Sequence, residues 1–282
     1  MDQAKTLRNI AQNSSITKVI SVTSGKGGVG KTNLISNLAY VLASAGKSVL
    51  LMDADLGLGN VDILLGIAPR YNISHVLSGE KSLEDIIVTG PAGIKIIPAS
   101  SGIQKVTDLS DDEKRYLLTA FENLSFDIDY FLIDTGAGIS KNVTYFCIAS
   151  QEIIVIATPE PTSITDAYAL MKVLSKNYGE NKFNLIVNLA KDKRDALQVF
   201  KTLTLVIDKY LGMDISLNYL GYVPADDRFP TVVRKQKLIT EIYPDSEVYK
   251  NLKKITEKLD DIEVDFTSKG NIQFFFNKLI SM

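Results

Sequence analysis

Cysteine and histidine are almost absent from this sequence. Among its 282 residues, Cys147 and His75 are the only members of their kinds. A single cysteine excludes a disulfide within one chain, and it also excludes multi-cysteine zinc and iron–sulfur sites. One histidine makes a histidine-rich metal site unexpected. We expect structural roles for both residues, Cys147 in the core and His75 near the start of a helix.

Long apolar runs and an excess of positive charge are lacking as well. No apolar run reaches the roughly 20 residues that a membrane-spanning helix needs, and residues 1–13 lack the apolar core of a signal peptide. The formal net charge is −2 and the pI is about 5.6, so no positive field would draw the chain to nucleic acid. These absences predict a cytoplasmic protein with no specific nucleic-acid partner.

Short apolar strands alternate with amphipathic helices along most of the chain. This alternation predicts an α/β fold with a mostly parallel, twisted sheet covered by helices on both faces, and the length favours a single large domain. The predicted strands are 19–23, 48–52, 94–98, 130–134, 153–157, 183–188 and 219–223, and predicted helices include 32–45, 111–124, 162–176 and 196–211.

A glycine-rich loop follows the first predicted strand. Residues 25–32 match the phosphate-binding pattern G-x-x-x-x-G-K-[ST] at every fixed position. Glycines let backbone N–H groups approach phosphate oxygens, and the following helix N-terminus adds its positive dipole end. Lys31 should neutralise the β- and γ-phosphates, and Thr32 should place its hydroxyl on Mg²⁺. The sequence therefore predicts a P-loop NTPase domain whose nucleotide-binding loop comprises Gly25, Lys26, Gly27, Gly28, Val29, Gly30, Lys31, Thr32 and Asn33.

Carboxylates follow two of the predicted strands. Asp53 and Asp55 come after strand 48–52, and Asp134 ends strand 130–134 in the Walker-B pattern. In a parallel sheet of this kind the carboxyl ends of such strands lie beside the phosphate loop. Asp134 should hold a water bound to Mg²⁺. Gly136 and Gly138 should let the next loop respond to the γ-phosphate.

Lys26 is a second lysine within the loop, and most P-loops do not need it. The segment K-G-G-x-G-K-T resembles the deviant loop of the MinD/ParA family of ATPases. The resemblance implies that Lys26 reaches across a dimer to the nucleotide of the other copy, where a cation stabilises phosphoryl charge. It also implies that Asp55 orients the attacking water and that Asp53 supports Mg²⁺ and the switch region. The expected catalytic residues are then Lys26, Lys31, Asp55 and Asp134, and the metal-site residues Thr32, Asp53 and Asp134.

One departure from the family pattern stands out. Many relatives read D-x-P-A-G after the Walker-B strand, whereas this chain has Thr135-Gly136 in the proline region. We therefore expect a more flexible second switch here.

The same resemblance predicts the base-binding residues. In the family, the edges occupied here by Asn188, Pro224 and Asp226 hold adenine, and an asparagine amide suits adenine N6 and N7. A GTPase would be expected to show N-K-x-D where this chain has N-L-A-K from Asn188 to Lys191. ATP and ADP are therefore the expected nucleotides, with Mg²⁺ as the metal.

The first 17 residues form a polar leader with the pattern D-Q-A-x-x-L-R. This leader is similar to that of the flagellar-placement branch of the family, the FlhG/FleN group. The resemblance implies that the leader binds and stimulates a signal-recognition-particle-type GTPase. A short peptide that folds on its partner fits this role, with contacts expected from Asp2, Gln3, Ala4, Leu7 and Arg8.

Residues 267–282 follow the predicted ATPase domain, 18–266, and have a different character. Apolar residues recur there at helical spacing and form one stripe, consisting of Ile272, Phe275, Phe276, Leu279 and Ile280. This stripe resembles the membrane-targeting helix of the same branch and of MinD. Basic residues are sparse, so one copy should bind lipid weakly, and a dimer with two copies should bind better through avidity. A terminal helix packed on the core is the alternative.

The expected function is that of a slow, dimer- and partner-dependent ATPase that regulates flagellar number or placement. It would form an ATP-dependent homodimer at the inner face of the cell membrane, with flagellar basal-body components or a transcription regulator as further candidate partners. The alternatives are a MinD-like division-site ATPase, a ParA-like DNA-partitioning ATPase and a scaffold without turnover. The single cysteine argues against an iron–sulfur carrier.

Overall fold

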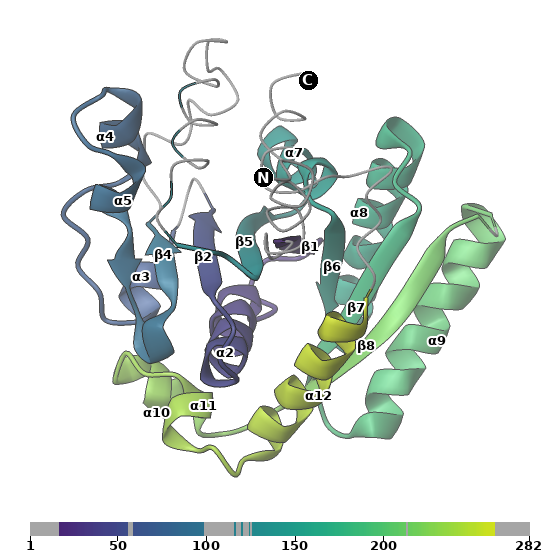
Figure 1. Cartoon of the computed structure of the whole chain (residues 1–282). Helices are drawn as coiled ribbons and strands as arrows, with labels where there is room; N and C mark the ends of the chain where they lie inside the picture. The colour runs from purple at the N-terminus through teal and green to yellow at the C-terminus, as the bar shows by residue number, and fades with distance from the viewer. Residues whose placement is uncertain are drawn as a thin grey trace, which may run out of the picture.

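The computed structural model describes residues 17–55, 59–98, 116, 120, 124, 126–212 and 214–262. These residues form an eight-stranded sheet with helices on both faces (Figure 1). The strand order is β3-β4-β2-β5-β1-β6-β7-β8, and all neighbours are parallel except β3 and β4. The strands are β1 (Lys18–Ser24), β2 (Val49–Ala54), β3 (Val88–Thr89), β4 (Lys95–Ile97), β5 (Tyr130–Ala137), β6 (Glu152–Ala157), β7 (Lys182–Ala190) and β8 (Ser216–Pro224). The mostly parallel α/β fold is therefore confirmed.

Helices connect most of the strands. They are α2 (Lys31–Ser44), α3 (Val61–Leu64), α4 (Ile73–Leu77), α5 (Leu83–Ile86), α7 (Lys141–Ala149), α8 (Pro161–Tyr178), α9 (Lys193–Tyr210), α10 (Phe229–Arg234), α11 (Ile239–Ile242) and α12 (Glu247–Asp261), with a 3₁₀ turn η1 at Pro91–Gly93. The predicted helices 32–45, 162–176 and 196–211 correspond to α2, α8 and α9. Most of the predicted helix 111–124 lies outside the described residues, as do the leader contacts and the C-terminal stripe.

The core lies on both faces of the sheet because successive strand residues point to opposite sides. Ile154 and Ile156 of β6 pack with residues of α2 and α12, whereas Ile153 and Val155 pack with residues of α8 and α9. In Figure 1, α12 runs beside α2, and α10 and α11 lie together next to them. The C-terminal helices thus cover the same face as the helix that follows the phosphate loop.

Two strands continue past the acids at which we expected them to end. β2 includes Asp53 and Ala54, and β5 runs through Asp134 to Ala137. Asp53 and Asp134 are register partners on neighbouring parallel strands. Ladder pairing therefore extends beyond the apolar runs, and it places two carboxylates side by side within the sheet.

Candidate nucleotide site

The phosphate loop joins β1 to α2, and its shape requires three of its four glycines, Gly25, Gly28 and Gly30. Gly28 and Gly30 have φ angles of 77° and 82°, in the left-handed region that favours glycine. A Cβ atom on Gly30 would lie 2.6 Å from Asn188 Nδ2, and one on Gly25 would lie 2.1 Å from the Asp166 carbonyl oxygen. No side chain caps the N-terminus of α2 at Gly30, so its first N–H groups suit an anion.

Lys31 and Asp134 form a buried ion pair at the end of the loop. Lys31 Nζ lies 2.6 Å from Asp134 Oδ1, and the two side chains are 7% and 1% exposed. Burial raises the pKa of Asp134, while the Lys31 charge opposes that rise. The other carboxylate oxygen, Asp134 Oδ2, has no hydrogen-bond partner among the described residues. An unpaired buried oxygen is costly, so this carboxylate fits a donor such as the predicted Mg²⁺-bound water.

Asp53 organises the start of the loop that follows β2. Its carboxylate accepts hydrogen bonds from the backbone N–H groups of Asp55 and Val61, both at 3.1 Å. Burial, assisted by the nearby Asp134 charge, raises the pKa of Asp53 to about 6. The carboxylate of Asp53 therefore ties β2 to the N-terminus of α3 and sits in the same charged cluster as Asp134.

A cavity of about 470 Å³ opens in front of the phosphate loop. It is lined by Ser24, Gly27, Gly28, Val29, Gly30, Lys31, Thr32, Asn33, Asp55, Asn60 and Ala137. Within the described ranges, there is no group of three or more histidine, cysteine, aspartate or glutamate side chains placed to hold a metal ion. A hydroxyl such as that of Thr32, phosphate oxygens and waters are the ligands that suit Mg²⁺ in this setting. The structure thus gathers the predicted Thr32, Asp55 and loop residues around one opening.

Lys26 is held within its own chain. Its ammonium pairs with the Glu160 carboxylate and donates a hydrogen bond of 2.9 Å to Thr162 Oγ1. Glu160 is the N-cap of α8, and Thr162 lies in its first turn. Sequence reasoning did not predict this contact because the partners lie more than 130 residues away. The lysine expected to act across a dimer is engaged by α8 in the single chain.

A second, apolar cavity adjoins Gly30 and Asn33. Its apolar lining consists of Leu34, Leu189, Val223, Phe229, Val248 and Leu252, with Asn33, Asn37 and Asn188 as polar members. The Asn188 side chain is fixed because its Nδ2 donates to the Val29 carbonyl at 2.7 Å. The other polar group of the Asn188 side chain is its amide oxygen, which is a hydrogen-bond acceptor. A flat apolar ring carrying an amine would fit such a cavity.

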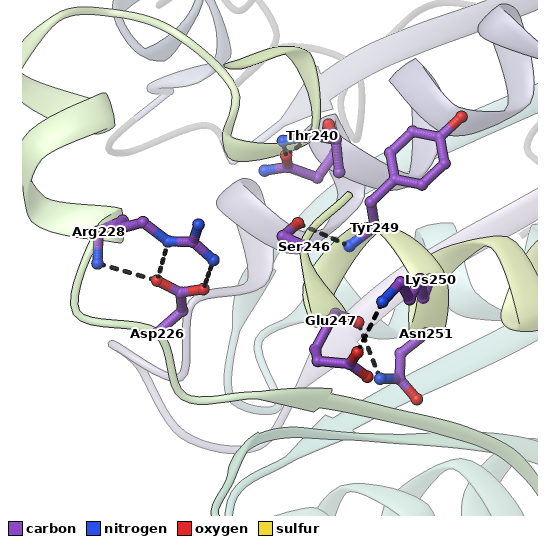
Figure 2. Close-up of polar contacts among 9 residues, drawn as sticks. Asp226, Arg228, Thr240, Ser246, Glu247, Tyr249, Lys250 and Asn251 are labelled. Carbon is purple, nitrogen blue, oxygen red and sulfur yellow. Dashed lines mark hydrogen bonds and ion pairs between the residues drawn. The ribbon is translucent and has the colours of Figure 1, made fainter. Parts of the chain in front are cut away.

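The other two predicted base-binding residues are not among those that line this cavity. Pro224 is the last residue of β8, and the Asp226 carboxylate accepts hydrogen bonds from Arg228 Nε at 2.8 Å and from an Arg228 terminal nitrogen at 2.5 Å (Figure 2). Their roles in base binding stay predictions. The Arg228 guanidinium also lies 4.4 Å from the centre of the Tyr243 ring, so Asp226 helps to fix the segment that carries Phe229.

Polar contacts hold the C-terminal helices over the apolar cavity. Asn37 of α2 accepts hydrogen bonds from both the N–H and the hydroxyl of Thr240. Ser246 caps α12 by accepting from the N–H of Tyr249, and Glu247 pairs with Lys250 (Figure 2). These contacts position Val248 and Leu252, which sequence reasoning missed because no local pattern links them to the phosphate loop.

The two rare residues are structural, as predicted. His75 completes a capping box with Asn72 at the start of α4, and Cys147 is fully buried in α7. In the part of the chain that the structure describes, no helix has both the length and the apolar character to cross a bilayer.

Comparison with known proteins assigns the family. Residues 17–187 match the family model described as an AAA domain. Antiactivator FleN of Pseudomonas aeruginosa is 40% identical over 93% of both chains, and flagellum site-determining protein YlxH of Helicobacter pylori is 33% identical over 98% of this chain and 94% of the relative. This chain belongs to the FleN and YlxH group of MinD/ParA-type ATPases. The septum site-determining protein MinD of Pyrococcus horikoshii, solved with Mg-ADP, has a TM-score of 0.68 and 26% identity and spans 87% of this chain and 96% of its own.

Membership of the FleN and YlxH group confirms the predicted family and an ATPase activity. The phosphate-loop cavity and the apolar cavity meet at Gly30 and Asn33, which is the arrangement that a nucleoside phosphate requires.

Proposed function

We propose that this chain is an ATP-dependent switch that regulates flagellar number or placement from the membrane surface. The observation that carries the proposal is the joined pair of cavities. One is surrounded by phosphate-binding N–H groups and Lys31, and the other is apolar with an oriented Asn188. The names of FleN and YlxH, an antiactivator and a flagellum site-determining protein, support the biological assignment.

The nucleotide is ATP with Mg²⁺. Mg-ATP supplies the phosphoanhydride bond that is hydrolysed, and the protein binds and orients it. Lys31 would leave Asp134 to bind phosphate oxygens, and Mg²⁺ would be held by the Thr32 hydroxyl and, through a water, by the Asp134 carboxylate, where it would neutralise phosphoryl charge. Asp55, at the edge of the cavity, orients the attacking water. The MinD structure solved with Mg-ADP supports this nucleotide.

A second chain completes the site. Lys26 is engaged by Glu160 in the single chain and leaves it to reach the phosphates of the other copy in an ATP-bound homodimer. Dimerisation then joins two copies of the C-terminal stripe, and avidity at the membrane follows.

Membrane binding is tested by sedimentation with vesicles that contain anionic lipid, using the full chain with Mg-ADP or Mg-ATP. We expect more protein to pellet with ATP. Phe276→Glu, on the predicted stripe, should abolish that pelleting, whereas Phe274→Glu, off the stripe, should reduce it less. Pelleting that ignores both the nucleotide and Phe276→Glu would contradict the proposal.

Partner stimulation is tested with a flagellar GTPase of the signal-recognition-particle type. The wild-type chain should accelerate its GTP hydrolysis, and Leu7→Asp in the leader should remove the effect. Asn13→Asp, outside the predicted contacts, is the matched control. Equal stimulation by wild type and Leu7→Asp would exclude the leader as the activator. ATP-dependent, salt-sensitive DNA binding without any GTPase effect would favour the ParA-like alternative.

A further inference from the structure

Helix α12 links the apolar cavity to a distant part of the domain. Val248, Leu252, Ile255 and Leu259 lie on one face of the helix, and each is at most 1% exposed. The first two line the cavity beside the phosphate loop. Further along, Ile255 packs so closely on β8 that a Cβ atom on Gly221 would lie 2.8 Å from Ile255 Cγ1. The helix is therefore in tight contact along its whole length.

The C-terminal end of α12 is anchored by residues of β1, of β5 and of the loop before β2. Lys18 Nζ donates to the carbonyl oxygens of Leu259 and Asp260 at 2.7 and 2.8 Å. The Asp260 carboxylate accepts from the Tyr130 hydroxyl at 2.7 Å and from Lys47 Nζ at 2.9 Å. The last carbonyls of a helix lack partners within the helix, so Lys18 satisfies groups that would otherwise be unpaired. We call Lys18, Lys47, Tyr130 and Asp260 the α12 junction.

Both ends of the described part of the chain lie at this junction. Lys18 is the first residue of β1 and comes directly after the 17-residue leader, and it is the register partner of Tyr130 on β5. Asp260 lies two residues before Ile262, where the described part of the chain ends ahead of the C-terminal segment. The points from which the leader and the C-terminal segment depart are thus joined by hydrogen bonds.

We propose that a ligand in the apolar cavity stabilises the docked position of α12. The docked helix in turn keeps the hydrogen bonds of the α12 junction closed, where the leader and the C-terminal segment begin. The inference rests on the proposed function, because it takes a nucleotide base as the occupant. A base in the cavity adds contacts to Val248 and Leu252 that exist only while α12 is docked. Helices open as cooperative units, so a ligand that requires the docked helix also suppresses opening at Leu259 and Asp260.

This coupling works in both directions. If the base favours the closed junction by some factor, then the closed junction must favour nucleotide binding by the same factor. Breaking the junction should therefore weaken ADP binding even though none of its four residues lines either cavity. A merely structural junction would not respond to ADP in this way.

The test is amide hydrogen exchange on the full-length chain with and without Mg-ADP. At ADP about ten times its Kd, amides of residues 256–262 should exchange about tenfold more slowly. In Lys18→Met, which keeps the methylene stem and removes the hydrogen bonds, this ADP effect should fall below about twofold at residues 259–262, and ADP should bind more weakly. Lys254→Met, at an exposed position on the same helix, is the control and should behave as wild type.

A second variant keeps the proposal testable if Lys18→Met does not fold. Tyr130→Phe combined with Lys47→Met removes the two side-chain donors to Asp260 and should give the same loss of ADP protection. Binding of ADP, measured by titration, that protects the phosphate loop but leaves residues 256–262 unchanged would overturn the inference and leave the proposed function intact. Absence of ADP binding would instead contradict the proposed function itself.

Discussion

The buried Lys31–Asp134 pair gives a quantitative prediction about the stability of the nucleotide-free protein. In Lys31→Met the Asp134 carboxylate, 1% exposed, loses the cation that lies 2.6 Å from it. Removing one member of a buried pair typically costs about 3–5 kcal/mol, because the remaining charge is left uncompensated. We expect the nucleotide-free variant to lose that much unfolding free energy at pH 8.

The loss should depend on pH with a definite sign. Burial already raises the pKa of Asp134, and loss of the lysine charge raises it further. A carboxyl with a raised pKa in the folded state stabilises the fold less as it loses its proton. The loss of unfolding free energy in Lys31→Met should therefore grow with pH, by at most about 1.4 kcal/mol per pH unit. The variant should therefore be distinctly closer to wild type in stability at pH 5 than at pH 8.

Urea unfolding of wild type, Lys31→Met, Asp134→Asn and the double variant forms a double-mutant cycle. The cycle separates the coupling energy of the pair from the effect of each single change. Asp134→Asn leaves Lys31 buried and unpaired, whereas Lys31→Met/Asp134→Asn removes both charges and should recover much of the stability. Lys237→Met, in an exposed pair with Glu241, is the control and should cost less than about 1 kcal/mol. A loss below about 1 kcal/mol for Lys31→Met at pH 8, or simple additivity of the two changes, would refute the reasoning.

Three further predictions concern the residues around the pair. Glu160→Gln should free Lys26 and strengthen ATP-dependent dimerisation by no more than about fivefold, since the contact is exposed. Weaker dimerisation by light scattering would contradict a restraining role for the Lys26–Glu160 pair. Asn188→Ala should weaken ADP binding about tenfold through loss of an oriented amide, and unchanged affinity by calorimetry would exclude Asn188 from the base site. Because burial raises the folded pKa of Asp53 from an ordinary 3.8 to about 6, ionisation of this carboxyl should lower the unfolding free energy by about 3 kcal/mol as pH rises through that window. Asp53→Asn should remove this contribution and exposed Asp227→Asn should not, and equal pH slopes of wild type and Asp53→Asn in urea unfolding would disprove the assignment.

The phosphate loop was predictable because its chemistry is local. Eight consecutive residues determine where glycines, Lys31 and Thr32 must lie, and the strand before and helix after are visible as apolar patterns. The meeting of Asp53 and Asp134 was also predictable in outline, because parallel strands bring their carboxyl ends to one edge. The sequence did not predict that Asp53 and Asp134 are register partners. Both strands continue beyond their apolar runs because backbone hydrogen bonds between β2 and β5 extend past them.

The apolar cavity could not be predicted in the same way. Its lining comes from α2, the end of β7, β8, α10 and α12, and a residue such as Phe229 carries no local sign that it faces a ligand. The contact between Lys26 and Glu160 depends likewise on how α8 packs against the phosphate loop. Such long-range contacts are set by packing of the whole sheet, which a single sequence pattern does not specify.

The central claim is that ATP, through Lys26, converts single chains into dimers. The direct measurement is the molar mass in solution of wild type and Lys26→Ala with Mg-ADP and with Mg-ATP. We predict the single-chain mass of 31.0 kDa with ADP and twice that mass with ATP for wild type, and the single-chain mass in both states for the variant. A wild-type mass that does not change with ATP, or an equal doubling in Lys26→Ala, would contradict the account.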